Sequence, residues 1–284
     1  MPATYRGRIA PSPTGFLHAG HAATFLTAAA RAHAAHGQLI YRNDDLDQER
    51  CRPEFTTAAM EDLRWLGLDW QEGPDLGGPH SPYAQSERLA FYLDAFEFLR
   101  QQRWIYPCSC SRREVASALS APHAIDEEPI YPGTCRPSQP TEFPSATRGV
   151  NWRFRILHPQ QLFFTDGLRG PQSAVAGRDF GDFLVWRRDG FPSYQLASAL
   201  DDSLMGITEV VRGADLITST FRQILIWRAL EQVAPAFYHC NLLTDAAGKR
   251  LAKRDKKHAL RTLREQETRD WPSILLTKSL APNR

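Results

Sequence analysis

Apolar and polar positions change period twice between residues 6 and 43. RGRIA at 6–10 predicts a short strand, the prolines and glycine of 11–15 predict a turn, and the alanine-rich run 21–35 predicts a helix that stops at Gly37. LIYRN at 39–43 then predicts a second strand. Together they form a parallel βαβ unit. The turn therefore lies at a strand's carboxyl end and a helix N-terminus, where open parallel sheets bind ligands and helices attract anions.

Two later patterns suggest how the chain continues. VWRRDGFPSYQLA at 185–197 places Asp189-Gly190 between two strand-like runs, which favours a hairpin. The segment 213–233 predicts a long amphipathic helix. Both patterns indicate that an α/β domain resumes late in the chain.

Composition narrows the class of protein. With 284 residues, of which 42% are hydrophobic, the chain can build one large domain with an insertion. A net charge of +2 allows a nucleic-acid partner without demanding one. No run approaches the ~20 apolar residues of a membrane span, and the first residues lack an apolar signal core, so we expect a cytoplasmic protein with no membrane partner. Five cysteines, an odd number, favour reduced thiols over a disulfide framework.

The turn of the βαβ unit carries two histidines. His18 and His21 are three residues apart, so both can reach one ligand from the first helical turn and donate to phosphate oxygens. Gly15 and Gly20 allow the backbone to approach that ligand closely. Neither common glycine-rich phosphate motif is present in the sequence. From H-x-G-H alone, histidines that merely cap the helix are an equal alternative.

The residues around this turn form a longer pattern. The string from Arg8 to His21 resembles the signature of class I aminoacyl-tRNA synthetases, in the form carried by the glutamyl and glutaminyl members. The resemblance continues in three further segments, and covers the chain from about residue 6 to about residue 255. These segments are RNDDLDQER (42–50), YQLASALDD with VVRGADLITST (194–220) and LLTDAAGKRLAKR (242–254).

The resemblance implies activation of an amino acid by ATP with Mg²⁺. The carboxylate attacks the α-phosphorus in line, so the protein positions reactants and neutralises charge. The residues implied to bind ATP are His18, Gly20, His21 and Lys253, with His18, His21 and Lys253 in catalytic roles. Two positions depart from the family, since Arg250 replaces a lysine and Ala252 a serine. Without the resemblance, the basic run around Lys253 reads as a solvated surface.

The resemblance also implies a pocket for L-glutamate. A substrate with two carboxylates and one ammonium calls for guanidinium groups and one acid. The implied residues are Arg8, Ala10, Ser12, Asp44, Tyr194 and Arg212, with the arginines near the side-chain carboxylate and Asp44 where the family has a glutamate. Taken singly, an arginine more often forms a surface salt bridge.

The cysteines form a separate constellation. Cys108, Cys110 and Cys135 supply three thiolates, and a tetrahedral zinc needs a fourth ligand. Ordinary metal chemistry suggests His123, with Asp126 behind it. The spacing Cys-x-Cys followed by Tyr-x-x-x-Cys resembles instead the glutamyl-queuosine tRNA(Asp) synthetases, which implies Tyr131 as the fourth ligand of one structural Zn²⁺ per chain.

Two smaller predictions accompany the cysteine segment. SRRE at 111–114 predicts a capping box at the start of a helix. The two remaining cysteines, Cys51 and Cys240, are predicted to be ordinary buried thiols.

The expected architecture is α/β: a Rossmann-type nucleotide-binding catalytic domain with a zinc-bearing α/β insertion and a short helical C-terminal remnant. The predicted parts are 1–105 and 184–236 for the catalytic domain, 106–183 for the insertion, and 237–284 for the lysine loop and remnant.

The chain also lacks length for the anticodon-reading region of glutamyl-tRNA synthetases, since it stops about thirty residues after the lysine loop. The resemblance therefore implies transfer of glutamate to queuosine at the first anticodon position, with the tRNA(Asp) anticodon stem-loop as partner and the enzyme as a monomer. Candidates for RNA contacts are Trp152, Arg153, Arg155, Lys256 and Lys257. Taken singly, a buried tryptophan and a solvated charged face are the commoner interpretation of such residues. A truncated glutamyl-tRNA synthetase that charges a 3′ end, and a non-catalytic RNA-binding paralogue, remain alternatives.

Overall fold

The N-terminal βαβ unit forms as predicted. The structure is a computed structural model that describes residues 4–111, 114, 130–243 and 259–265. Strand β1 (Arg6–Ile9) pairs in parallel with β2 (Gln38–Tyr41), and α1 (Ala19–Ala34) connects them. Helix α1 begins two residues earlier than predicted because His18 caps it, accepting a hydrogen bond from the Gly20 amide at 3.1 Å.

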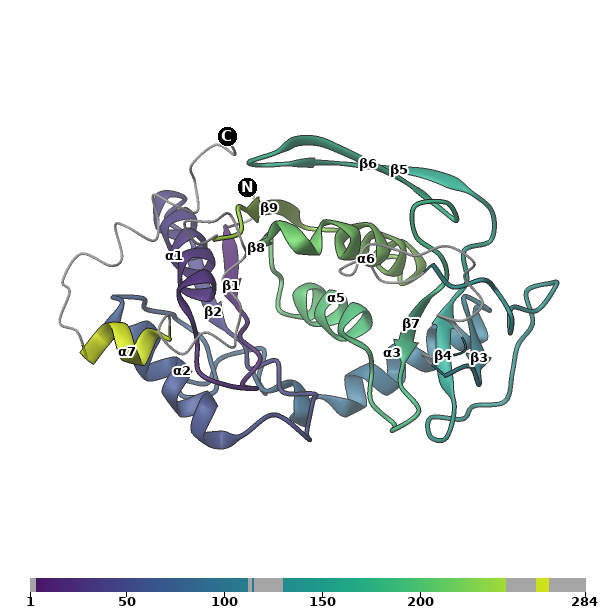
Figure 1. The fold of residues 1–284 in the computed structure, drawn as a ribbon, viewed down its shortest axis with the longest axis horizontal. Helices are drawn as coiled ribbons and strands as arrows, with labels where there is room; N and C mark the ends of the chain where they lie inside the picture. Colours follow the sequence, from purple (N-terminus) through teal and green to yellow (C-terminus); the bar gives the residue numbers. More distant parts are fainter. Residues whose placement is uncertain (1–3, 112–113, 115–129, 244–258, 266–284) are drawn as a thin grey trace.

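A second parallel pair continues this layer. Strand β8 (Glu209–Gly213) runs parallel to β9 (Ala236–Cys240), and lies beside β1, where the Thr208 amide donates to the Arg6 carbonyl at 2.9 Å. The hairpin of β5 (Gln160–Asp166) and β6 (Gly170–Ala176) joins β9 through Asp166, opposite Phe237. Figure 1 shows this hairpin passing over α6 towards β9. Helix α1 packs against β1, β2 and β8.

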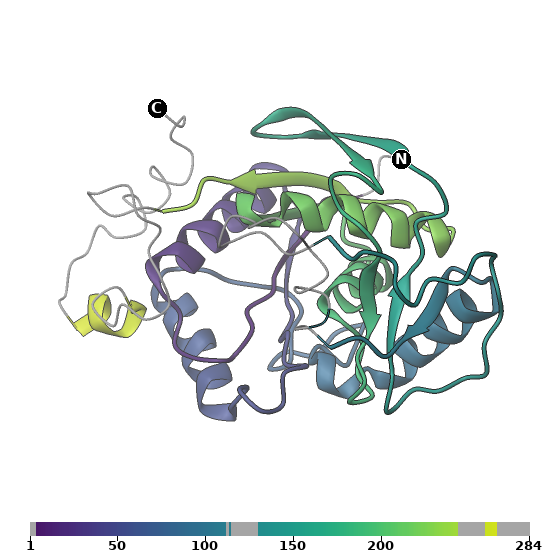
Figure 2. The ribbon, with the colours of Figure 1, turned by 45° about the vertical axis from the view of Figure 1, so that its right-hand side comes forward.

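A separate antiparallel sheet builds the other end of the molecule. It consists of β3 (Ile105–Cys108), β4 (Asn151–Phe154) and β7 (Phe183–Trp186), in the order β3-β4-β7. Helix α3 (Leu89–Gln101) lies against this sheet, as Figure 2 shows. Trp152 of β4 is 0% exposed and packs edge-on against Phe96 at 5.0 Å between ring centroids. Trp152 is therefore a core residue.

Both late sequence patterns need correction. Asp189-Gly190 does form a tight turn, with Gly190 at φ +97° and the Arg187 amide bonded to the Phe191 carbonyl. Only one bridge, Trp186 to Pro192, follows it, because α5 begins at Tyr194. The strand-like look of FPSYQLA reflects burial of a helix, since a short apolar run does not distinguish the two.

The predicted long amphipathic helix is shorter and is buried nearly all round. Residues 214–216 form the 3₁₀ turn η2 (Ala214–Leu216), and α6 spans Ile217–Ala229. From Ser219 to Ala229 every side chain except Arg228 is buried, including Arg222 and Gln223. Helix α6 packs on α5 and carries part of the larger core, so it has no broad solvent face.

The remaining elements connect these layers. They are α2 (Pro53–Trp65), the 3₁₀ turn η1 (Gln85–Glu87), α5 (Tyr194–Leu204) and α7 (Leu260–Glu265). Helix α7 contacts α2. Within the described ranges, no helix is long and apolar enough to cross a membrane. The boundaries predicted at 106 and 183 stay a prediction.

A buried network of charges joins these elements. Arg42 is fully buried after β2 and donates to Asp44 at 2.7 Å and to Asp202 of α5 at 2.8 Å. Asp201, also on α5, accepts from Arg88 at 2.7 Å. Two neutral side chains also donate hydrogen bonds to the Asp201 carboxylate, Gln85 at 2.8 Å and Tyr92 at 2.7 Å. Isolated buried charges would cost several kcal/mol each, so these groups are stable only together.

Replacing Arg88 by Met tests this network. The change leaves the fully buried Asp201 without its nearest cation, so we expect the free energy of unfolding to fall by about 3–5 kcal/mol. The control is Tyr92→Phe, which removes one neutral donor from the same carboxylate and should cost about 1–2 kcal/mol. Urea denaturation compares the two variants. Equal losses would contradict the charge argument.

Candidate active site

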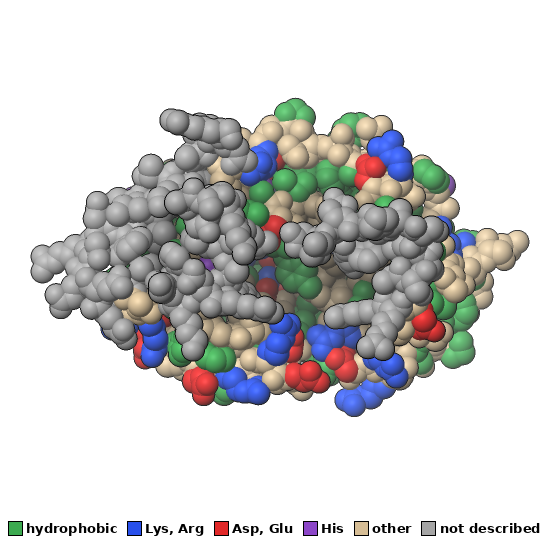
Figure 3. All heavy atoms as spheres, viewed as in Figure 1, with side chains coloured by type: hydrophobic (Ala, Val, Ile, Leu, Met, Phe, Trp, Pro, Cys, Tyr) green, Lys and Arg blue, Asp and Glu red, His purple; other side chains and the backbone are tan. Residues whose placement is uncertain are grey.

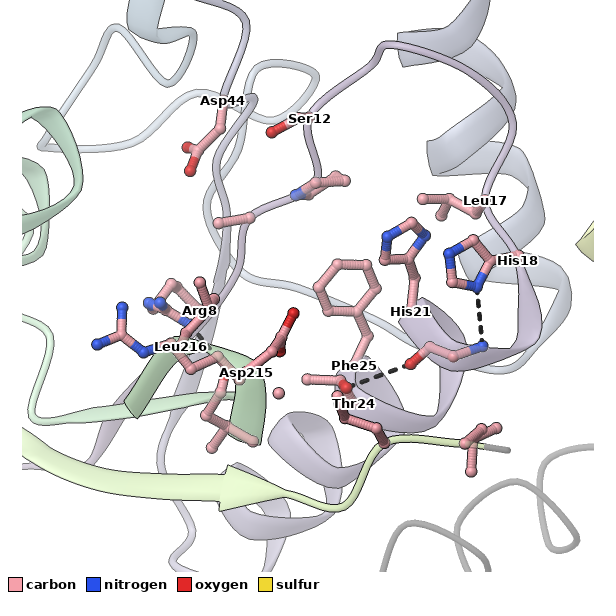
Figure 4. Close-up of a pocket in the computed structure, with 18 of the residues that line it drawn as sticks. Arg8, Ser12, Leu17, His18, His21, Thr24, Phe25, Asp44, Asp215 and Leu216 are labelled. Atoms are coloured by element: carbon pink, nitrogen blue, oxygen red, sulfur yellow. Dashed lines mark hydrogen bonds between the residues drawn. The ribbon is translucent and has the colours of Figure 1, made fainter. Parts of the chain in front are cut away.

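A pocket of about 240 Å³ opens at the carboxyl ends of β1 and β8 and the N-terminus of α1 (Figure 4). Every predicted ATP or glutamate residue that the structure describes lines it: Arg8, Ala10, Ser12, His18, Gly20, His21, Asp44, Tyr194 and Arg212. Lys253, Arg250 and Ala252 lie outside the described residues. The molecular face in Figure 3 is hollowed at its centre, with Lys, Arg, Asp and Glu along the lower rim.

The two histidines lie together at the helix start. Their ring centroids are 3.8 Å apart, and His18 is held by the Gly20 amide (Figure 4). A Cβ at Gly20 would lie 3.0 Å from His18 Cε1, so a side chain there would press on the imidazole. The turn therefore presents two imidazoles at the positive end of a helix dipole, which suits a phosphate.

Asp44 gives the pocket a carboxylate. Burial raises the pKa of Asp44 to about 6, and the neighbouring Arg42 guanidinium only partly offsets that effect. Arg8 reaches the same region and is already paired, donating to Asp202 at 3.2 Å and to the Val211 carbonyl at 2.9 Å. Asp44 can thus hold a cationic group when it is ionised.

Arg212 differs from Arg8 in its partners. Its side chain is 4% exposed and donates to Tyr194 Oη at 3.2 Å, Thr220 Oγ1 at 2.7 Å and His239 Nε2 at 3.3 Å. Burial lowers the pKa of Arg212. Among the residues that the structure describes, no carboxylate forms an ion pair with it. Within the described part of the chain, Arg212 is therefore a buried cation of the pocket that has no carboxylate partner and can meet an anionic ligand.

Sequence reasoning missed several residues behind the pocket. Arg42, Asp201 and Asp202 lay inside the segments that carry the family resemblance, and a search for acids and bases within those segments would have found them. His239 and Asp166 are 73 residues apart and belong to no motif. No local signal connects them.

The three clustered cysteines also come together. The sulfur atoms of Cys108, Cys110 and Cys135 lie within 4.8 Å of one another. Tyr131 Oη lies 3.4 Å from Cys108 Sγ and 3.6 Å from Cys110 Sγ. Burial opposes ionisation of Cys135, but hydrogen bonds from Tyr131 and other neighbours outweigh it and lower the pKa of this thiol to about 6. The cluster is consistent with a metal site, and His123 and Asp126 lie outside the described residues.

The predicted capping box is confirmed. The Ser111 amide donates to Glu114 Oε2 at 2.6 Å, and the Glu114 amide donates to Ser111 Oγ at 3.2 Å. Cys240 is buried as predicted, whereas Cys51 is only half-buried, so that prediction was wrong.

The structure does not support the candidate RNA contacts on and just after β4. Trp152 is enclosed in the core, so it offers no face to a base. Arg153 lies over the Tyr131 ring at 3.8 Å and donates to Cys108 Sγ at 3.2 Å, and Arg155 is buried. Trp152 and Arg155 as RNA contacts were wrong predictions because both side chains are covered by protein. Lys256 and Lys257 lie outside the described residues.

The fold and the pocket now define a class. Residues 4–281 match the family described as tRNA synthetases class I (E and Q), catalytic domain. The α/β fold, with H-x-G-H at the first strand-to-helix turn, is that of a class I tRNA synthetase catalytic domain.

Proteins of similar sequence show to which family within this class the chain belongs. The glutamyl-Q tRNA(Asp) synthetase of Symbiobacterium thermophilum is 49% identical over 251 residues, which are 87% of this chain and 77% of that relative. The protein of the same name in Nitratidesulfovibrio vulgaris is 46% identical over 261 residues, 91% of this chain and 81% of that relative. The chain belongs to the glutamyl-Q tRNA(Asp) synthetase family.

A solved structure shows the same fold. The glutamate-tRNA synthetase of Elizabethkingia anophelis superposes with a TM-score of 0.77 at 30% identity, over 89% of this chain and 53% of that one. The chain thus spans about half the length of that solved relative.

Asp44 provides a pH test of the pocket. Because its pKa in the folded chain, about 6, exceeds the ordinary value of 3.8, the folded protein keeps this proton to higher pH than the unfolded one. Its contribution to the free energy of unfolding is therefore greatest below pH 4 and is lost as the pH rises through 6.

Asp44→Asn has no proton to lose. We expect the difference in unfolding free energy between wild type and variant to shift by about 3 kcal/mol between pH 4 and pH 7, measured by urea denaturation. Carboxyl ¹³C NMR should place the Asp44 midpoint near pH 6. A midpoint near 4 would contradict the assignment.

Proposed function

We propose that this chain activates L-glutamate with ATP and transfers it to the queuosine base at the first anticodon position of tRNA(Asp). One observation carries the proposal: Arg212, a buried guanidinium without a carboxylate partner among the described residues, lines the same pocket as Asp44 and the His18 turn. Identity of 46% and 49% to glutamyl-Q tRNA(Asp) synthetases supports the choice of acceptor.

In the proposed amino-acid site, Arg212 meets the substrate's side-chain carboxylate. Arg8 adds positive potential but shares its charge with Asp202, so Arg212 supplies most of the attraction. Tyr194 accepts a hydrogen bond from Arg212 and donates its hydroxyl proton to the same substrate carboxylate, while Asp44 holds the α-ammonium. Ala10 and Ser12 complete the wall of the pocket. Asp44 is one methylene shorter than a glutamate, so the ammonium must approach it more closely.

In the proposed activation step, the glutamate α-carboxylate attacks the α-phosphorus of Mg²⁺-bound ATP, and pyrophosphate leaves. His18, His21 and the amide end of α1 neutralise the phosphates, while Gly20 allows close approach. We assign Lys253 to the side of the phosphates opposite the two histidines. After the segment carrying Lys253, the described chain resumes beside the turn, where Ala259 bridges to His18 and the Leu260 amide donates to the Leu17 carbonyl at 2.9 Å.

The second step transfers the glutamyl group. A hydroxyl oxygen of the queuosine cyclopentene ring attacks the carbonyl carbon of glutamyl-adenylate, AMP leaves with the bonding pair, and the hydroxyl proton passes to the departing phosphate. We assign no side chain as base in this step. The mixed anhydride is reactive enough that positioning of the hydroxyl supplies most of the acceleration.

We further propose that Cys108, Cys110, Cys135 and Tyr131 hold one Zn²⁺ in the inserted segment 106–183. Three sulfurs within 4.8 Å and an adjacent phenol fit a tetrahedral site, and a thiol with lowered pKa binds a cation readily. Burial raises the pKa of Tyr131, so the cation must displace its proton. Four protein ligands leave no open position, so the ion's role is to hold the fold.

The acceptor is tested with two tRNA(Asp) preparations, one with queuosine and one with guanosine at the same position. We expect labelled glutamate to appear only on the queuosine tRNA, because only that base offers the ring hydroxyl. Equal labelling would show 3′-end charging, the reaction named for glutamate–tRNA ligases that are 41–43% identical to this chain. Absence of glutamate-dependent ATP–pyrophosphate exchange with tRNA present would remove the enzymatic proposal altogether.

The fourth zinc ligand is tested by metal content. We expect Tyr131→Phe to weaken zinc retention against a competing chelator by roughly 10–100-fold, and His123→Ala to leave it unchanged. Elemental analysis of the two purified variants measures this. Zinc loss from the histidine variant alone would assign His123 instead.

A further inference from the structure

Arg212 is fixed from behind by a buried histidine. His239 of β9 is 0% exposed, and its Nε2 lies 3.3 Å from Arg212 Nε and 2.9 Å from Thr220 Oγ1. Its Nδ1 lies 2.6 Å from Asp166 Oδ2. A chain of contacts therefore runs from Asp166 through His239 to the guanidinium in the pocket.

The partners determine the protonation state of this histidine. A guanidinium only donates, so His239 Nε2 must accept from Arg212, and the ring proton must sit on Nδ1, where it is donated to Asp166. Burial and the charge of Arg212 lower the pKa of His239 to about 4, although Asp166 opposes them. The ring is neutral at pH 7.

Asp166 is held rigidly in turn. Its Oδ1 accepts the amides of Leu168 and Arg169 at 3.0 and 2.9 Å, and its Oδ2 accepts the amide of His239 at 3.0 Å as well as Nδ1. It is the last residue of β5, in the hairpin that joins β9. Asp166 therefore fixes both the position and the tautomer of the imidazole.

A neutral acceptor at this position has a specific electrostatic consequence. A carboxylate touching Arg212 would bind it more strongly, but would cancel the charge that a substrate carboxylate needs. The imidazole orients the guanidinium and keeps the negative charge of Asp166 one ring further away. His239 thus sets the orientation of the guanidinium, while the positive charge of Arg212 stays available to a substrate carboxylate.

We propose that His239 is a positioning residue that sets the selectivity of the pocket for an acidic side chain, by holding Arg212 through a neutral acceptor whose tautomer Asp166 fixes. This inference rests on the proposed function, in which the substrate is glutamate. It adds to that function the groups that aim Arg212.

The kinetic test is Asp166→Asn. An amide facing Nδ1 can donate to it and drive the proton to Nε2, which then opposes Arg212. In ATP–pyrophosphate exchange with tRNA present, we expect KM for glutamate to rise about 10–100-fold, discrimination against glutamine to fall, and KM for ATP to change less than about threefold. Asp182→Asn is the matched control, since Asp182 is also 2% exposed and accepts from a backbone amide and two side chains.

A pair of histidine variants separates positioning from packing. His239→Gln retains a neutral acceptor near Nε2 and should keep most of the discrimination, whereas His239→Leu should lose it. Discrimination unchanged in both Asp166→Asn and His239→Leu, or equal rises of KM for ATP and glutamate, would overturn the proposal.

A measurement on the unsubstituted protein does not depend on catalysis. Ring ¹⁵N NMR should show His239 protonated at Nδ1 and not at Nε2 at pH 7, and the opposite in Asp166→Asn. Protonation at Nε2 in the wild type would overturn the inference even if the enzyme is active. Wild-type protein without glutamate-dependent exchange but with the Nδ1 proton would instead count against the proposed function.

Discussion

The structure depends on the requirement that charges leave water only in compensating groups. Arg42, Arg88 and Arg8 are buried with Asp44, Asp201 and Asp202, three cations with three anions. These six side chains come from β1, the segment after β2, the approach to α3, and α5. None of these segments can shift without separating a buried pair, so the network holds Arg8 and Asp44, its two members that line the pocket, in place.

Arg212, which lines the pocket, differs from these paired arginines. The hydrogen bonds that it donates to Tyr194, Thr220 and His239 go to neutral atoms, and no carboxylate among the described residues pairs with its charge. Asp44 is the complementary case, a carboxylate whose charge is costly enough that its pKa rises to about 6. A ligand of opposite charge stabilises each of these groups. Part of the free energy that their burial costs the folded protein is therefore recovered when the ligand binds.

Much of this arrangement follows from the sequence. The βαβ unit has strong local signals, and the pocket residues lay in motifs close enough to a known family that their meeting could be foreseen. Local pattern failed where burial decided the outcome: Tyr194 begins a helix, Arg155 is buried, and α6 is covered on nearly all sides. The contact between His239 and Asp166 could not be predicted from the sequence for another reason: only the pairing of β5 with β9 brings these residues together.

The position of Asp166 limits how freely the segment between β3 and β7 can be exchanged. In the sequence, this segment looks like an independent insertion into a catalytic domain that would fold without it. In the structure its hairpin supplies Asp166, the anion behind His239 and Arg212. A chimaera that received the segment from a distant relative would therefore need a matching residue at position 239. The pocket at α1 and the segment that carries the cysteines are therefore physically connected through Asp166 and His239.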